Sequence, residues 1–189
     1  MRVIPWVLTV SGAVWTTGNI AVAAAAVAAF HWQRSNPEVI SREGLGGALG
    51  AGFGLWSSLV AVPLFAAMVS LGWLAGTSWR LAKRARAVYV VAAMVLLWGV
   101  HSVNHQTVVE ANQLAAGIRE LRTNRAPGAP DAAATEAPLT NLEQRFAVMH
   151  QASERWHGIE TLLSLALLIS GSVLILRRPA ASSAVPVSA

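Results

Sequence analysis

Four long apolar stretches separated by short polar segments constrain this chain more than any other feature. Of its 189 residues, 54% are hydrophobic and only 12% are charged, which is too little charge for the surface of a soluble domain. A helix that crosses a bilayer needs about 20 mainly apolar residues. We therefore predict an all-α membrane protein. The expected fold is a four-transmembrane-helix antiparallel bundle, with helices 3 and 4 extending beyond the outer membrane surface.

The predicted spans lie within one domain of residues 1–178, and they cover about residues 4–30, 45–75, 88–108 and 156–176. The first apolar run is too long for a signal peptide, so we expect it to be retained as a helix. Asn36–Pro37 predicts the start of the second helix. The Pro-, Ala- and Gly-rich residues 123–139 predict a flexible outer loop, and residues 179–189 a disordered cytoplasmic tail.

Positive charge sets the expected orientation. Arg2, the basic cluster from Arg80 to Arg86, and Arg177–Arg178 fall on one side of a four-span bundle. The positive-inside rule makes that side the cytoplasm, so we predict a multi-pass protein of the bacterial inner (plasma) membrane with both termini cytoplasmic. The net charge of +5 is then explained by contact with the lipid bilayer, and no nucleic-acid partner is expected. The chain has no cysteine, which excludes disulfides and thiolate chemistry.

Glycine recurs every fourth residue on one face of the predicted second helix, at Gly46, Gly50 and Gly54. Without side chains there, another helix can approach closely, and in lipid such packing drives association. We expect this face to pack on the alanine series of the first helix, which comprises Ala21, Ala25 and Ala29. The alternative is a contact with another membrane protein or with a second copy of the chain.

Polar residues form facing stripes on the predicted third and fourth helices. The fourth begins at a T-x-x-E capping box, Thr140 to Glu143. Residues of the two helices lie opposite each other when their numbers add up to about 262, if both run straight to the loop. This register predicts the pairs His105–His157, Asn112–His150 and Arg119–Glu143, with Glu154 close to His105.

The cluster of His105, Glu154 and His157 can be interpreted in three ways. Two imidazoles and a carboxylate are the minimum of a transition-metal site, to which His101 and His150 are possible additions. A bis-histidine site for haem b, using His101 or His105 with His157, is the second, although four thin spans leave little room for haem. The third, which we favour, is a structural hydrogen-bonded network without a cofactor. A di-iron site is rejected because the third helix offers no carboxylate on that face.

Several short motifs resemble the transmembrane protein 205-like family, a bacterial integral membrane domain of unknown function. They are Ser11-Gly12-Ala13, Phe30 before a polar loop and a glycine-rich helix, Asn104, and Phe146-x-x-x-His150-x-x-Ser153. The resemblance spans about residues 10–176 and implies a four-helix membrane bundle without an established chemistry. The chain departs from the family pattern at Ala111, where a proline is expected, and at Gln151, where a glycine is expected. Glu154 and His157 also stand where milder polar residues are expected.

The function predicted from these patterns is that of a non-enzymatic membrane protein, a structural, accessory or interaction subunit. The middle of each predicted span lacks Asp, Glu, Lys and Arg, which argues against a proton-coupled transporter. Two alternatives stay open: a metal- or haem-binding protein using the histidines and Glu154, and a channel or carrier for a small solute.

Overall fold

The structure is a computed structural model that describes residues 3–123 and 132–177. These residues form five helices and no strand: α1 (Ile4–Ser35), α2 (Arg42–Leu59), α3 (Ala61–Arg80), α4 (Arg84–Thr123) and α5 (Ala132–Leu176). Four stretches, 4–35, 44–80, 84–123 and 136–176, are long and apolar enough to cross a membrane. The prediction of an all-helical chain with four candidate spans is therefore confirmed.

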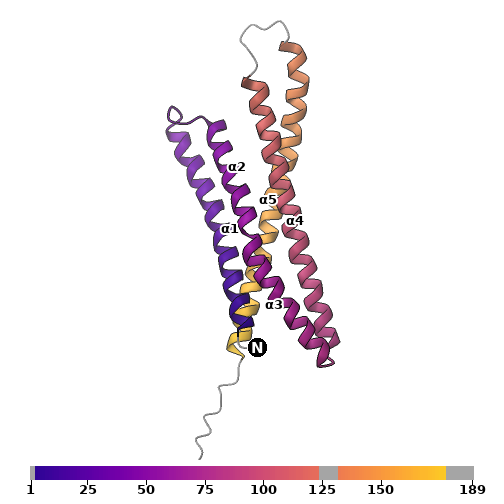
Figure 1. Ribbon diagram of the computed structural model, residues 1–189. Coiled ribbons are helices and arrows are strands. Elements are labelled where there is room, and N and C mark those ends of the chain that lie inside the picture. The colour runs from indigo at the N-terminus through magenta and orange to yellow at the C-terminus, as the bar shows by residue number, and fades with distance from the viewer. Residues whose placement is uncertain (1–2, 124–131, 178–189) are drawn as a thin grey trace, which may run out of the picture.

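The second candidate span consists of two helices, because α2 ends and α3 begins at Val60. Pro63 follows within one turn; it has no N–H to offer the carbonyl of Leu59, and its ring crowds that carbonyl. Hydrogen bonds on either side continue the helical pattern, from the N–H of Val60 to Trp56 at 2.9 Å and from that of Leu64 to Val60 at 3.1 Å. α2 accordingly lies beside α1, while α3 runs across to the beginning of α4 (Figure 1).

The boundaries of α1 and α2 differ from the prediction. Asn36 ends α1 and its side-chain amide donates to the carbonyl of Trp32 at 2.9 Å, so Asn36–Pro37 closes a helix and does not open one. α2 begins after Ser41, whose hydroxyl accepts a hydrogen bond from the N–H of Gly44 at 3.0 Å. A serine at this position satisfies an N–H that the helix itself leaves unpaired.

α5 begins earlier than predicted, at Ala132, so the expected loop of residues 123–139 is wrong for its second half. Residues 124–131 and the tail of residues 179–189 lie outside the described part of the chain. Thr140 is inside the helix and its hydroxyl donates to the carbonyl of Glu136 at 2.9 Å, so it does not cap a start. The alanine-rich sequence favours helix strongly enough to continue across Pro138.

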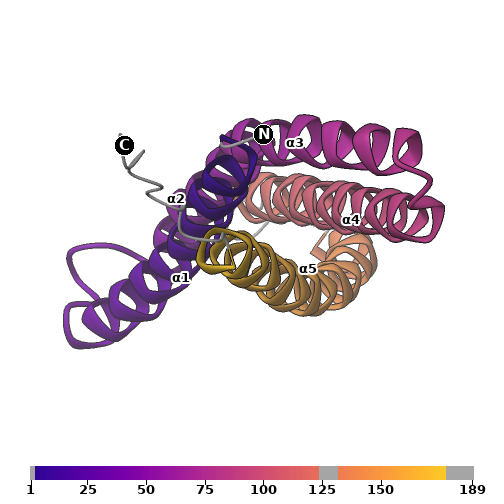
Figure 2. The same ribbon diagram turned by 90° about the horizontal axis from the view of Figure 1, so that it is seen from below.

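The four candidate spans alternate in direction along the bundle, with α2 and α3 running the same way (Figure 1). The beginning of α1, the turn between α3 and α4, and the end of α5 lie at one end, which we call the basic end. It carries the basic residues Arg80, Lys83, Arg84, Arg86 and Arg177. The opposite end, which we call the hairpin end, holds the turn between α1 and α2 and the ends of α4 and α5 that face the 124–131 connection (Figures 1 and 2).

α1 and α5 come closest at two glycines. A Cβ atom on Gly12 would lie 2.5 Å from the backbone nitrogen of Leu168, and one on Gly171 would lie 2.6 Å from the backbone nitrogen of Thr9. The two backbones are thus in direct contact, as small residues allow between membrane helices. Next to this contact, a cluster of apolar side chains fills the bundle toward the basic end: Leu8, Trp15, Val60, Leu64, Ala67, Leu71, Leu97 and Leu167.

The predicted pairing of the α2 glycines with the α1 alanines is wrong. Gly50 and Gly54 approach the side chain of Asn112 in α4, which donates to the carbonyl of Gly50 at 2.9 Å. Gly46 has no neighbour within 4 Å of the position its Cβ would take. In α1, Ala21 and Ala25 are exposed. The glycine face therefore makes room for a polar side chain that satisfies a backbone carbonyl.

Because of the α1–α5 contact, the same glycine-to-alanine change should affect stability very differently at two positions of α5. Gly171→Ala places a methyl group against the backbone of Thr9 and should lower the free energy of unfolding by about 1–3 kcal/mol. Gly158→Ala, also in α5, meets open space and should leave stability unchanged or slightly raised. Thermal unfolding of both variants in the same detergent checks this expectation. Equal midpoints for the two would contradict the close contact.

Candidate functional site

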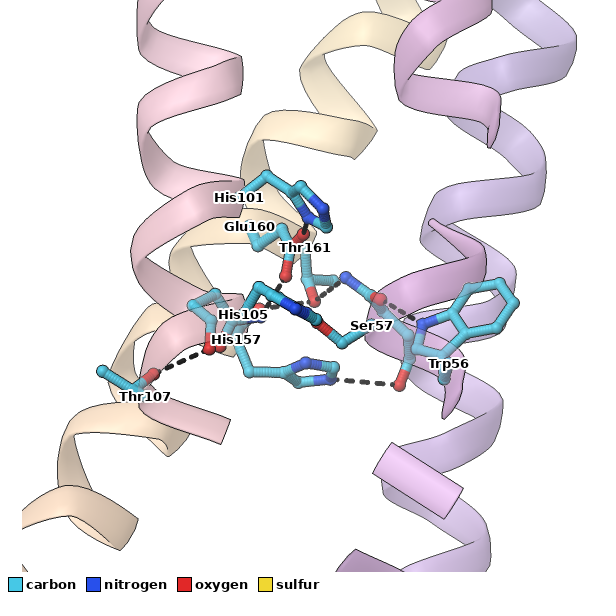
Figure 3. A network of polar contacts seen from close by, with 10 residues as sticks. Trp56, Ser57, His101, His105, Thr107, His157, Glu160 and Thr161 are labelled. Carbon is cyan, nitrogen blue, oxygen red and sulfur yellow. Dashed lines mark hydrogen bonds and ion pairs between the residues drawn. The ribbon is translucent and has the colours of Figure 1, made fainter. Parts of the chain in front are cut away.

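Glu160 of α5 is the most unusual residue of the bundle. It is an acidic residue inside the predicted membrane span, and it is only 2% exposed. Two side chains of α4 bind its carboxyl group. Nδ1 of His101 lies 2.8 Å from Oε1 (Figure 3), and the side-chain amide of Asn104 donates to Oε2. A charged group in hydrocarbon is costly unless it is paired, and both oxygens of Glu160 have a partner.

The spacing of residues along the two helices produces this arrangement. His101, Asn104 and Val108 follow one another at intervals of three and four, and all are buried on the face that α4 presents to its neighbours. On α5, Glu160, Ser164 and Leu167 form the corresponding buried face. Because the helices are antiparallel, Glu160 meets His101 and Asn104 one turn apart. We call these three residues the carboxyl centre.

Asn19 of α1 joins three helices beside the carboxyl centre. Its side-chain oxygen accepts a hydrogen bond from the indole N–H of Trp56 in α2 at 2.7 Å. Its side-chain nitrogen donates to the hydroxyl of Thr161 in α5 at 3.1 Å, and Nε2 of His157 lies 3.3 Å from its backbone carbonyl. The residue is 1% exposed, and both the nitrogen and the oxygen of its side-chain amide make interhelical contacts.

A pair of hydroxyl groups lies on the basic-end side of these contacts. The hydroxyls of Thr16 in α1 and Ser164 in α5 are 2.9 Å apart, and both residues are buried. Beyond this pair along α1 and α5 come Leu8 and Leu167 of the apolar cluster. The polar network therefore ends at the apolar cluster and does not continue to the basic end.

His105 connects the carboxyl centre with the hairpin end. Its ring is stacked on that of His101, with centroids 6.2 Å apart and planes inclined by 30°. Nδ1 of His105 lies 2.9 Å from the hydroxyl of Ser57 in α2. The same side chain lines a groove of about 530 Å³ between α4 and α5, together with Gln106, Glu110, Gln113 and Arg145 among others. His105 thus contacts both a hydrated surface and the innermost histidine.

Two buried polar atoms near the carboxyl centre have no hydrogen-bond partner within the described part of the chain. They are Oδ1 of Asn104 and the indole nitrogen of Trp15. The ring of Trp15 stands edge-on to His101, with centroids 6.2 Å apart. An unpaired buried polar atom costs about 1–3 kcal/mol, so the carboxyl centre keeps hydrogen-bonding capacity that the described residues do not use.

The structure separates the three residues predicted as metal ligands. His105 contacts Ser57, His157 contacts the backbone of Asn19, and Glu154 is exposed and pairs with His150 on the same helix, at 3.3 Å. Within residues 3–123 and 132–177, no group of three or more potential ligands comes together. Of the possible additions, His101 belongs to the carboxyl centre, while the His150 ring stacks on Phe146 at the surface.

The predicted α4–α5 register is close, but none of its three pairs forms: His105 and His157 bind Ser57 and Asn19 instead of each other, and the other two pairs also differ. Arg122, not Arg119, binds Glu143, at 2.7 Å, and Asn112 turns to Gly50 in α2 instead of His150. The argument against a proton-coupled transporter relied on the absence of Asp, Glu, Lys and Arg from the middle of the spans. It also fails, because Glu160 is buried inside the bundle.

Glu160 could have been found from the sequence. The register sum of about 262 places it opposite residue 102, between His101 and Asn104. Asn19, a polar residue in the middle of an apolar run, also predicts an interhelical hydrogen bond, and this is confirmed, but its position alone does not identify Trp56 and Thr161 as its partners.

The carboxyl centre predicts a large difference between two glutamates of α5. Glu160→Ala leaves His101 and Asn104 buried without their partner and should lower the free energy of unfolding by roughly 3 kcal/mol. Glu154→Ala removes an exposed pair and should change stability by less than about 0.5 kcal/mol. Denaturation of both variants in one detergent measures the difference. Equally small effects would show that the buried pair does not hold α4 to α5.

Comparisons with protein-family models, with curated proteins and with solved structures give no match to this chain. The resemblance to the transmembrane protein 205-like family therefore stays a prediction. The interpretation of the site depends on its geometry alone.

Proposed function

We propose that the chain is a non-enzymatic, multi-pass membrane protein that serves as a structural or accessory subunit. The observation that carries this proposal is that the buried polar side chains bind one another across helices. Glu160 with His101, Asn19 with Trp56, and Thr16 with Ser164 join α1, α2, α4 and α5. Polar bonds of this kind fix the relative positions of membrane helices, which is what a rigid support for a partner needs.

The length of α4 and α5 supports an interaction role. At 1.5 Å per residue, their 40 and 45 residues correspond to about 60 and 68 Å, roughly twice the thickness of the hydrocarbon core. In our proposal the parts nearest the 124–131 connection project from the membrane as a helical pair. Ion pairs between Arg122 and Glu143 and between Arg145 and Glu110 link the two helices there.

The proposed orientation places the basic end in the cytoplasm of a bacterial cell, in the inner membrane. The arrangement of Figure 1 supports it, because the arginine and lysine residues between Arg80 and Arg86 share an end with Arg177. Such a concentration of basic residues is typical of the cytoplasmic side. The long pair of α4 and α5 then faces the outside of that membrane.

A carrier for a small solute is the second candidate. It is favoured by two grooves that reach the polar network, one of about 530 Å³ at His105 and one of about 420 Å³ that Asn19, His157 and Thr161 help to line. A metal or haem site ranks below it, because the structure gives His105, Glu154 and His157 separate partners.

The orientation is testable because the chain has no cysteine of its own. Single variants Glu120→Cys near the end of α4 and Lys83→Cys in the α3–α4 turn report on opposite ends of the bundle. A membrane-impermeant maleimide should label Glu120→Cys in cells with a permeable outer envelope and intact inner membrane. It should label Lys83→Cys only after the inner membrane is lysed. The reverse pattern would invert the proposed topology.

The accessory role predicts a defined neighbour for the projecting part of α5. Val148 is 66% exposed outside the predicted span of 156–176, and His150 is exposed on the other side of the helix. A photo-cross-linking residue at Val148 should give one adduct of fixed mass in cells, and the same residue at His150 should give much less. Solute uptake into vesicles carrying the protein should equal that of empty vesicles. Uptake above that level, without a discrete adduct, would favour the carrier instead.

A further inference from the structure

We infer that Glu160 and His101 form a proton-binding centre, which exchanges protons with the hairpin end of the bundle through His105. This inference goes beyond the accessory role proposed above and does not depend on it. The contact between Nδ1 of His101 and Oε1 of Glu160, 2.8 Å long, requires a proton between the two atoms. Three forms of the pair have a proton there: a neutral imidazole protonated on Nδ1 donates to the carboxylate, the imidazolium donates to the carboxylate, or the carboxylic acid donates to the neutral imidazole. The last two forms hold one proton more than the first, and we call them the protonated pair.

Both forms of the protonated pair have no net charge, and loss of the proton leaves one negative charge in the core. Among the residues that the structure describes, no other charged side chain pairs with Glu160 to compensate that loss. The titratable groups that face the pair are His105 on α4 and His157 on α5, the latter turned to the Asn19 carbonyl. Residues 4–30 on α1 and 44–79 on α2 and α3 contain no Asp, Glu, His, Lys or Arg. Proton binding therefore removes a charge that nothing else on the packed helices offsets.

Asn104 can bind the carboxyl group of Glu160 in both protonation states. Toward the carboxylate it donates from its side-chain nitrogen, as the structure shows. Its Oδ1 is buried and has no partner in the described part of the chain. Rotation of the amide by half a turn would present Oδ1 to a protonated Oε2, so that the O–H donates to an acceptor already in place. The otherwise costly unpaired oxygen thus has a use when the carboxyl takes up a proton.

The route for the proton is open on one side. His105 contacts the His101 ring and lines the groove at the hairpin end, where Glu110 and Arg145 meet the solvent. An imidazole can accept a proton on one ring nitrogen and release one from the other, which suits His105 as a relay. Because the described contacts stack the two rings without a hydrogen bond between them, the transfer requires a bridging water molecule or a turn of the His105 ring. On the other side, the Thr16–Ser164 pair is followed by the apolar cluster. The second groove, at Asn19, His157 and Thr161, also lies toward the hairpin end and is lined mainly by apolar side chains, so the proton-binding site opens toward one end of the bundle.

Two measurements on reconstituted protein test this inference. Infrared difference spectra between acid and alkaline conditions, over the range in which the fold is intact, should contain the carbonyl band of a carboxylic acid shielded from water. The band should be lost in Glu160→Gln, an isosteric change. If that variant does not fold, Glu160→Asp keeps a buried carboxyl group and should shift the band. A wild-type spectrum without the band, and without imidazolium bands that are lost in Glu160→Gln, would overturn the proton-binding centre, as would a carboxylic-acid band unchanged by either substitution.

The entrance is tested with Trp15, whose ring contacts His101 and whose emission should be quenched by the imidazolium. The Trp15 contribution is obtained by subtracting the spectrum of a Trp15→Phe variant. In vesicles with uniformly oriented protein, acid added on the hairpin side should quench it promptly, and acid on the other side only after an ionophore is added. His105→Phe should remove the prompt response, whereas His150→Phe, a surface control, should keep it. Equal responses from both sides, or an unchanged response in His105→Phe, would overturn the proposed route.

Discussion

The arrangement of α4 and α5 depends on the free-energy cost of placing the carboxyl group of Glu160 between apolar helices. In water Glu160 would need no partner, but inside a membrane bundle its charge must be compensated within hydrogen-bonding distance. His101 and Asn104 meet that requirement from one face of α4. A shift of α5 by one turn along α4 would separate all three residues. The same contact that makes Glu160 tolerable therefore also fixes the register of the two longest helices.

The remaining contacts between helices are of two kinds, close packing of the backbones and hydrogen bonds between polar side chains. At Gly12 and Gly171 the α1 and α5 backbones touch, so dispersion forces act over the shortest possible distance. One to two turns along the same pair of helices, Thr16 and Asn19 bond to Ser164 and Thr161. The glycines set how close the helices come, and the polar groups set their rotation and axial position. Neither contribution alone would specify a single arrangement in lipid, where apolar surfaces gain little by meeting one another.

The sequence predicts most of the spans because hydropathy is a local property, and it predicts the α4–α5 register because one connection joins the two helices. It does not predict which helix a face will meet. Gly50 and Gly54 indicated a close approach, but the approaching group is Asn112 and not an alanine of α1. A stripe on a helix gives the direction of a side chain and not its partner. For that reason the facing stripes predict that His105 and His157 meet, whereas in the structure they turn toward α2 and α1 respectively.

The distribution of polarity along the bundle has a consequence for any chemistry at its centre. Toward the basic end, Leu8, Leu64 and Leu167 surround the axis, and they offer neither donors nor acceptors to a polar species. Toward the hairpin end, His105 stands between the carboxyl centre and a groove with polar walls. A proton or a water molecule therefore meets a lower barrier on the hairpin side, because polar side chains line that side. The apolar cluster thus acts both as the core that stabilises the bundle and as the barrier that makes its centre one-sided.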